Sequence, residues 1–410
     1  MSTPAQWLWM QQTFGIGTAR AHTALERYGT AEEILALGAR RLAGDTWLTK
    51  RERDAIASPD LGGAQRLLDR AQALGFAILT PDSPCYPVRL RMIASPPLVL
   101  YARGDVTLLA DPYPVAMVGT RDPDEYGRRA ARKIATEIAG WGGTVVSGLA
   151  RGIDAVCHES ALAVGGRTVA FLAAGCDSDY PRVNASLRRE IAARGLLVTE
   201  FPAGMPVRPH SFHVRNRLIS GLSLATVVVQ AARRSGSLIT AGHALAQDRD
   251  VYAVCGSIFS AKMAGCHALL GEGAAPIVSG ETLLREYERI YGIAPEPVAA
   301  AERIAALANP ADEPLPTARV RSGGSPRRAR APTKPAVVPE APAAKSVSPA
   351  VIASLTGEQE AVYTACAAES GFDELCERTM LEAAQLLRTL TQLEIFGLIE
   401  EKPGRRFCRI

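Results

Sequence analysis

Short apolar runs alternate with longer segments of helical periodicity between residues 115 and 254. Runs rich in β-branched residues stand at 115–118, 144–147, 168–172, 196–199, 226–230 and 251–254. Between them, Ile134, Ile138 and Trp141 mark one helical face, and Leu187 with Ile191 marks another. Parallel strands are buried on both faces and need helical crossovers, so this alternation predicts a mostly parallel, doubly wound α/β sheet.

A different pattern precedes this region. The first sixty residues have helical spacing around a Gly15-Ile16-Gly17 turn, which predicts a helical N-terminal domain over 1–72, of helix-hairpin-helix or SAM-like type. The same turn joins plain helical hairpins, so its glycines are not counted among the candidate site residues. Apolar runs at 77–79 and 98–101 predict strands that extend the sheet of a second domain, over 73–294.

The C-terminal part has two further patterns. Residues 295–353 are rich in Pro, Ala and Arg without periodicity, which predicts a flexible linker. Residues 354–410 then show helical segments at 358–366, 372–379 and 381–396, followed by two short runs, 398–401 and 406–409, around a Pro-Gly turn. Three helices and a hairpin are the order of a winged helix.

Composition and charge exclude several classes of protein. With 47% hydrophobic and 21% charged residues over 410 positions, the chain is neither fibrous nor wholly disordered. Residues 318–345 carry a net charge of +6 within a total of +4, so the rest of the chain sums to −2 and an anionic partner must meet local basic sites. The eight cysteines contain no C-x-x-C pair, and no apolar run approaches a membrane span, which predicts a cytoplasmic protein without structural metal or membrane partner.

Chemistry in such a sheet is expected in the loops after the strands, where helix N-termini present unpaired N–H groups. Four loops combine small residues with arginines or hydroxyls and lack nucleotide fingerprints, which favours phosphate binding over a dinucleotide cofactor. The candidate residues for DNA binding are Gly119, Thr120, Arg121, Gly148, Arg151, Gly152, Arg208, Phe212, Arg215, Asn216, Arg217, Ser235, Gly236 and Ser237.

The segment 206–217, PVRPHSFHVRNR, is the most informative of these and is expected to be a loop. Basic side chains interleaved with an aromatic suit a single strand, because phosphates bind arginines and an unstacked base binds a flat ring. Two alternatives stay open here. In the first, Arg215 and Arg217 pair with carboxylates and Phe212 fills the core, so that none of them binds a strand. In the second, Arg121 forms a salt bridge at the sheet edge and does not bind phosphate.

Catalytic motifs are absent from the sequence. No H-E-x-x-H, G-x-S-x-G or carboxylate cluster occurs in the expected loops, so we expect no catalytic residue, metal or cofactor. The segment 258–277 has more apolar residues than one helix must bury, and Ile258, Leu269 and Leu270 are therefore expected at a homodimer interface.

Several signatures together resemble the DNA-processing protein A family (DprA, also called Smf). They are VGTR at 118–121, SGLARGIDA at 147–155, GCDSDYP at 175–181, RNRLISGLS at 215–223 and SGSLITA at 235–241. The resemblance implies an extended Rossmann fold that binds single-stranded DNA, dimerises, and loads RecA on incoming strands during natural transformation. None of these properties follows from composition or spacing.

Two other functions compete with this reading. The first is a nucleotide-processing enzyme, because the family's sheet is related to that of phosphoribohydrolases; the glutamate of their glycine-rich turn is missing from RRSGSLITAGHA, and Gln230 ends the neighbouring strand. The second is transcription regulation through the winged helix, whose third helix carries only Arg388 against Glu382 and Glu394. The sequence favours a non-enzymatic DNA-binding protein.

Overall fold

The computed structural model describes residues 2–295, 297–298, 357–368, 370–381, 385–386, 389–390, 393, 398–402 and 406–409. The chain divides into two compact units, Met1–Arg319 and Val320–Ile410. Most of the linker expected over 295–353 and much of the third winged-helix helix, expected over 381–396, lie outside the described residues. The expected domain boundaries therefore stay predictions.

A nine-stranded sheet organises the described part of the first unit, in the order β1-β2-β6-β5-β4-β3-β7-β8-β9. From β6 to β9, every pair of adjacent strands in this order is parallel. At the other edge, β1 pairs antiparallel with β2, and β2 pairs antiparallel with β6. The strands are β1 (Ala77–Leu79), β2 (Leu100–Gly104), β3 (Pro114–Val118), β4 (Thr144–Ser147), β5 (Arg167–Leu172), β6 (Leu196–Thr199), β7 (Ala225–Val228), β8 (Asp250–Val254) and β9 (Ala275–Ile277). The predicted doubly wound, mostly parallel fold is confirmed.

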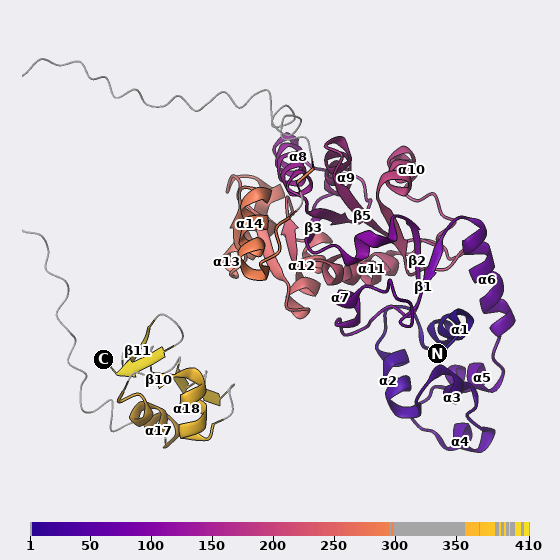
Figure 1. Cartoon of the computed structure of the whole chain (residues 1–410), viewed down its shortest axis with the longest axis horizontal. Coiled ribbons are helices and arrows are strands. Elements are labelled where there is room, and N and C mark those ends of the chain that lie inside the picture. Colours follow the sequence, from indigo (N-terminus) through magenta and orange to yellow (C-terminus); the bar gives the residue numbers. More distant parts are fainter. Residues whose placement is uncertain are drawn as a thin grey trace, which may run out of the picture. The chain divides into compact units, whose positions relative to one another are not determined.

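Helices cover both faces of this sheet (Figure 1). They are α7 (Val88–Arg91), α8 (Glu125–Gly140), α9 (Ile153–Ala163), α10 (Ala185–Arg194), α11 (Pro209–Leu222), α12 (Ser237–Ala246), α13 (Ala264–Gly271) and α14 (Gly280–Tyr291), with 3-10 turns η1 (Val106–Ala110), η2 (Arg182–Asn184) and η3 (Ala261–Met263). Helices α8, α9 and α10 pack on β3 to β6, and α11 and α12 pack together on the sheet. The chain order reverses direction at β3, whose neighbours are β4 and β7.

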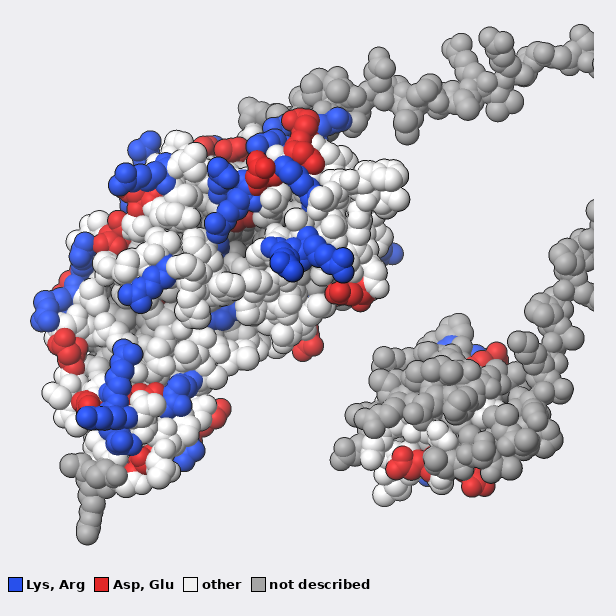
Figure 2. All heavy atoms as spheres, turned by 180° about the vertical axis from the view of Figure 1, so that it is seen from behind, with Lys and Arg blue, Asp and Glu red and all other residues white. Residues whose placement is uncertain are grey.

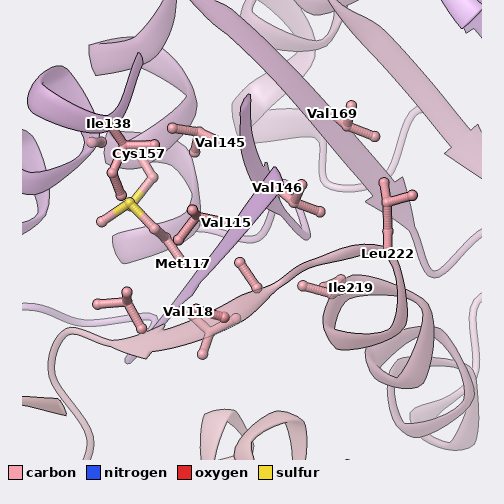
Figure 3. Close-up of a cluster of buried hydrophobic side chains, with 14 of the residues drawn as sticks. Val115, Met117, Val118, Ile138, Val145, Val146, Cys157, Val169, Ile219 and Leu222 are labelled. Carbon is pink, nitrogen blue, oxygen red and sulfur yellow. The ribbon is translucent and has the colours of Figure 1, made fainter. Parts of the chain in front are cut away.

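The core lies between these layers. Figure 3 shows Val115, Met117 and Val118 of β3 beside Val145 and Val146 of β4, with Cys157 and Ile138 from the covering helices. All five residues of β3 are buried, as expected for a central parallel strand. At the start of α8, the Asp124 carboxylate accepts a hydrogen bond from the Gly127 amide at 2.9 Å, so the helix begins directly after the loop that follows β3.

Six helices precede the sheet: α1 (Pro4–Phe14), α2 (Arg20–Tyr28), α3 (Ala31–Leu35), α4 (Ala39–Gly44), α5 (Lys50–Ala57) and α6 (Leu61–Ala73). Their core includes Leu8, Met10 and Ile34 and continues into Tyr101 of β2. Gly17, in the turn after α1, has φ +71°, and a Cβ there would lie 2.5 Å from Val214 of α11. This glycine turn therefore packs on the sheet domain.

The second unit contains α17 (Gly357–Ala365), β10 (Ser370–Gly371), α18 (Phe372–Thr379), β11 (Ile399–Lys402) and β12 (Arg406–Arg409). β12 pairs antiparallel with both β10 and β11, and Val362, Leu375 and Phe407 belong to its core. The predicted C-terminal winged helix is confirmed. Among the residues that the structure describes, no helix has the length and apolar character needed to cross a membrane.

Candidate nucleic-acid interface

A cavity of about 590 Å³ opens where the sheet changes direction. Its walls come from the loop after β3, the loop after β4, the helix α11 and the turn between β7 and α12. Ligands of open α/β sheets bind at such a point, outside the carboxyl ends of the strands. The residues that line it are Val118, Gly119, Thr120, Arg121, Ala150, Asp154, Pro209, Phe212, His213, Arg215, Asn216, Ile219, Ser235, Gly236, Ser237, Ile239 and Thr240.

Two arginines of different character face this cavity. Arg121 is exposed, and its guanidinium carbon lies 4.7 Å from the centre of the Phe212 ring, within cation–π range. Arg215 is only 4% exposed and donates to the carbonyl of Phe171 at 2.8 Å, while its Nε has no hydrogen-bond partner. A buried guanidinium with an unused donor beside an open cavity is suited to an incoming anion.

The charge of Arg215 is maintained despite its burial. Burial lowers the pKa of Arg215 to about 10, the neighbouring Asp154 opposes that change, and Arg121 adds to it. The guanidinium is therefore protonated at neutral pH. Among the cavity-lining residues, Asp154 is the only acid, and burial raises the pKa of its carboxyl group. The Asp154 carboxylate accepts a hydrogen bond from the Ala150 amide at 3.3 Å.

Hydroxyl groups line the opposite wall. The Ser235 and Ser237 hydroxyls lie 2.8 Å apart and share a hydrogen bond at the start of α12, and Thr240 follows in the same helix. Because helix N-termini carry partial positive charge, this wall also favours an anion. Arginines, hydroxyls and an aromatic ring therefore surround one cavity, and these are groups that bind phosphates and an unstacked base.

Nine of the fourteen predicted site residues line the cavity: Gly119, Thr120, Arg121, Phe212, Arg215, Asn216, Ser235, Gly236 and Ser237. Three others support its wall. A Cβ on Gly148 would lie 1.7 Å from a guanidinium nitrogen of Arg215, and Gly152, with φ +90°, brings the loop after β4 against the Thr120 carbonyl. Arg151 donates to the Arg121 carbonyl at 3.2 Å. Arg208 is exposed at the N-cap of α11, outside the cavity lining.

The expectation that Arg217 contacts phosphate is wrong for the described structure. Its guanidinium lies 2.5 Å from the Glu200 carboxylate, with side-chain exposures of 7% and 2%, and donates to the Ser95 carbonyl at 2.6 Å. The Gln11 side-chain amide of α1 also donates to the Glu200 carbonyl at 3.2 Å. The pair therefore joins the N-terminal helices to the sheet domain, which is the carboxylate-pairing alternative for this residue.

The segment that holds these residues is also not a loop. Helix α11 begins at Pro209, so Phe212, Arg215 and Arg217 all lie on a helix. Sequence reasoning also missed Tyr180, whose ring contacts Phe212 edge to face with centres 5.8 Å apart. An aromatic next to Pro181 in the loop after β5 was the available signal for it.

The expected dimer residues divide into two groups. Leu269 is 8% exposed and Leu270 packs on the sheet core, because α13 lies on β8 and buries this face. Leu269 therefore belongs to the core, and its assignment to an interface was wrong. Ile258 is 79% exposed and its neighbour Phe259 is 92% exposed.

The surface charge of the first unit is mixed on the face seen in Figure 2. Figure 2 shows basic and acidic side chains side by side over the face it presents, without one large field of either sign. This agrees with the charge of −2 outside residues 318–345. Among the described residues there is no group of His, Cys, Asp and Glu suited to a metal ion.

Comparison with known proteins gives consistent matches. The family model described as DNA recombination-mediator protein A matches residues 77–288, and the DprA winged helix domain matches 346–405. Protein Smf of Synechocystis is 33% identical over 419 residues, covering 100% of this chain and 99% of its own, and DNA processing protein DprA of Bacillus subtilis is 40% identical over 221 residues, covering 54% and 74%. The X-ray structure of DprA from Streptococcus pneumoniae superposes with a TM-score of 0.61 at 29% identity, covering 70% of this chain and 99% of that one.

Proposed function

Since the chain belongs to the DNA recombination-mediator protein A family of DNA processing proteins, we propose that it binds single-stranded DNA in the cavity where its sheet changes direction. The observation that carries the proposal is the meeting of Arg121, Arg215 and Phe212 at one cavity. The two guanidinium groups provide charge for phosphates, and the ring provides a surface for a base that is not paired.

Duplex DNA fits this arrangement poorly. The Phe212 ring is half-buried at a cavity wall, and a base reaches it only when that base is unstacked from its neighbours. A preference for single strands, with little sequence preference, is therefore expected.

The wider role that we propose is recombination mediation in the cytoplasm. The bound single strand is protected and RecA is loaded on it during natural transformation. The family description as a recombination mediator supports this role. It needs no chemistry at the cavity, and we propose that the chain is not an enzyme. Gln230, where a carboxylate would stand in an enzyme of related fold, donates to Asp124 at 2.9 Å and accepts from the Asp124 amide at 3.1 Å, so it is committed to holding the start of α8.

We also propose that the chain forms a homodimer through the loop after β8. Ile258 and Phe259 expose their apolar side chains there, and burying them is favourable by about 1.5–3 kcal/mol each. Light scattering at tens of micromolar is expected to give the dimer mass. Phe259→Glu is expected to give the monomer mass, whereas a monomer in the parent protein would contradict the proposal.

The test of DNA binding is a titration of the full chain with labelled oligo-dT and a matched duplex at several salt concentrations. Oligo-dT is expected to bind more tightly, with a logarithmic salt slope of about 0.7 for each phosphate neutralised. Phe212→Leu is expected to weaken oligo-dT binding by about 1–3 kcal/mol at an unchanged slope. Equal affinity for both DNA forms, or a flat salt response, would falsify the proposal. Hydrolysis of an added nucleotide would favour the enzyme of related fold instead.

A further inference from the structure

Tyr180 lies beside Phe212, which lines the proposed DNA cavity, and is not itself part of that lining. It belongs to the loop between β5 and η2, and the residue is 38% exposed. Its ring centre lies 5.8 Å from that of Phe212, with an angle of 65° between the two rings. In such an edge-to-face pair, the faces of one ring are not covered by the flat face of the other.

The two rings differ in which of their faces are free to stack on a base. One face of Phe212 is occupied by the guanidinium of Arg121 at 4.7 Å from the ring centre. Phe212 therefore has at most one face left for a base. Tyr180 has no cation–π partner among the described residues.

The loop that carries Tyr180 is anchored on both sides of the ring. Before it, the Asp177 carboxylate accepts hydrogen bonds from Arg70 at 2.7 Å and from the Gly204 amide at 2.8 Å. After it, the Asn184 side chain donates to the Leu149 carbonyl at 3.0 Å. These contacts tie the loop to α6, to the segment after β6 and to the loop after β4.

The backbone at the ring itself is also constrained. The Tyr180 amide donates to the Ser178 hydroxyl at 3.2 Å, so the backbone at the ring is held by a local hydrogen bond. A loop held in place before binding loses little conformational entropy when a base stacks on the side chain that it carries.

From this geometry we propose that Tyr180 is a nucleobase-stacking residue that extends the DNA site beyond the cavity. The base that stacks on Tyr180 belongs to the nucleotide next to the one held at Phe212, so the strand leaves the cavity over the loop between β5 and η2. The inference rests on the proposed function, because it names a further contact of the same site. It predicts a contact to bases and not to phosphates.

The test uses two probes that differ only in their bases. One is a labelled oligo-dT of about twenty nucleotides, and the other is an abasic oligomer with the same number of phosphates. Tyr180→Leu in the full chain is expected to weaken oligo-dT binding by about fivefold or more and to leave abasic binding unchanged. Tyr180→Phe, which keeps the ring, is expected to bind oligo-dT within about twofold of the parent. The matched control is Tyr291→Leu, which removes a 52% exposed tyrosine of α14 outside the cavity and should change neither probe.

Three outcomes separate the possibilities. If Tyr180→Leu leaves oligo-dT binding unchanged, or weakens the binding of both probes equally, the stacking role of Tyr180 is overturned. The cavity itself is tested separately by Phe212→Leu. Absence of single-strand preference in the parent protein removes the proposed function itself. A second readout covers a Leu variant that fails to fold. Photocrosslinking of the parent protein with an oligonucleotide containing 5-iododeoxyuridine is expected to modify Tyr180, and modification of Phe212 alone would overturn the proposal.

Discussion

Replacing Arg217 by Ala should damage folding and spare DNA binding. Its guanidinium lies 2.5 Å from the Glu200 carboxylate, and both side chains are nearly inaccessible. Removing one partner of such a pair leaves a buried carboxylate without its countercharge, which typically costs about 3–5 kcal/mol. The loss also removes the donor to the Ser95 carbonyl. We therefore expect the free energy of unfolding of Arg217→Ala to fall by roughly that amount.

The matched comparison is Arg121→Ala. Arg121 is exposed and lines the cavity, and substitutions at exposed positions usually change stability by less than about 0.5 kcal/mol. Its removal takes one cation from the proposed phosphate site. The logarithmic salt slope of oligo-dT binding should therefore fall by about 0.7 in Arg121→Ala. For the folded fraction of Arg217→Ala, the logarithmic salt slope of oligo-dT binding should equal that of the parent protein.

The assay combines urea unfolding with oligo-dT titrations at four salt concentrations. A double variant, Glu200→Gln with Arg217→Met, removes both charges and should recover part of the stability lost in Arg217→Ala. A lower salt slope in Arg217→Ala with unchanged unfolding would refute this reasoning. It would mean that the pair opens when DNA binds and that Arg217 reaches a phosphate.

Three further predictions follow from other parts of the chain. Gly148→Ala places a methyl group 1.7 Å from a guanidinium nitrogen of Arg215. It should lower the free energy of unfolding in urea by about 1–3 kcal/mol and should also weaken oligo-dT binding. Burial lowers the pKa of His158 to about 3, so as the pH falls below about 6.5 the imidazole takes up a proton in the unfolded chain but not in the folded one. The free energy of unfolding should therefore drop by about 2 kcal/mol between pH 7 and pH 5, and His158→Gln should remove that drop. Deleting 295–410 should weaken binding to single strands and duplex by a similar factor and keep the single-strand preference, since the +6 segment at 318–345 has no aromatic residue for stacking; a lost preference would move the site out of the sheet domain.

The sheet is the part of the fold that the sequence predicts best. The observed strands at Thr144–Ser147 and Leu196–Thr199 have the predicted bounds, and Pro114–Val118 differs by one residue. These strands are buried on both faces, so each appears as a continuous apolar run that does not depend on its neighbours. The order of the strands in the sheet cannot be predicted in the same way, because it depends on long-range pairing that no local sequence pattern contains.

The apolar residues of α13 show how this limit affects a site prediction. Leu269 and Ile258 are equally apolar in sequence, yet one is 8% exposed and the other 79% exposed. The difference arises because α13 packs on β8, whereas Ile258 lies in the loop that follows β8. Counting apolar residues therefore identifies a surplus without identifying which of its members remain at the surface.

The basic segment that begins at Pro209 shows the same limit within one helix. Phe212, Arg215 and Ile219 recur at spacings of three and four, and all three line the cavity. Arg217 is two residues beyond Arg215, which is about 200° around a helix, so both arginines cannot face the same cavity. Proline is favoured at the first position of a helix, so Pro209 was the available signal that this segment begins a helix on which the two arginines face different ways. Which face meets the cavity depends on the crossover from β6 to β7 past β3, and that is fixed by the order of the strands.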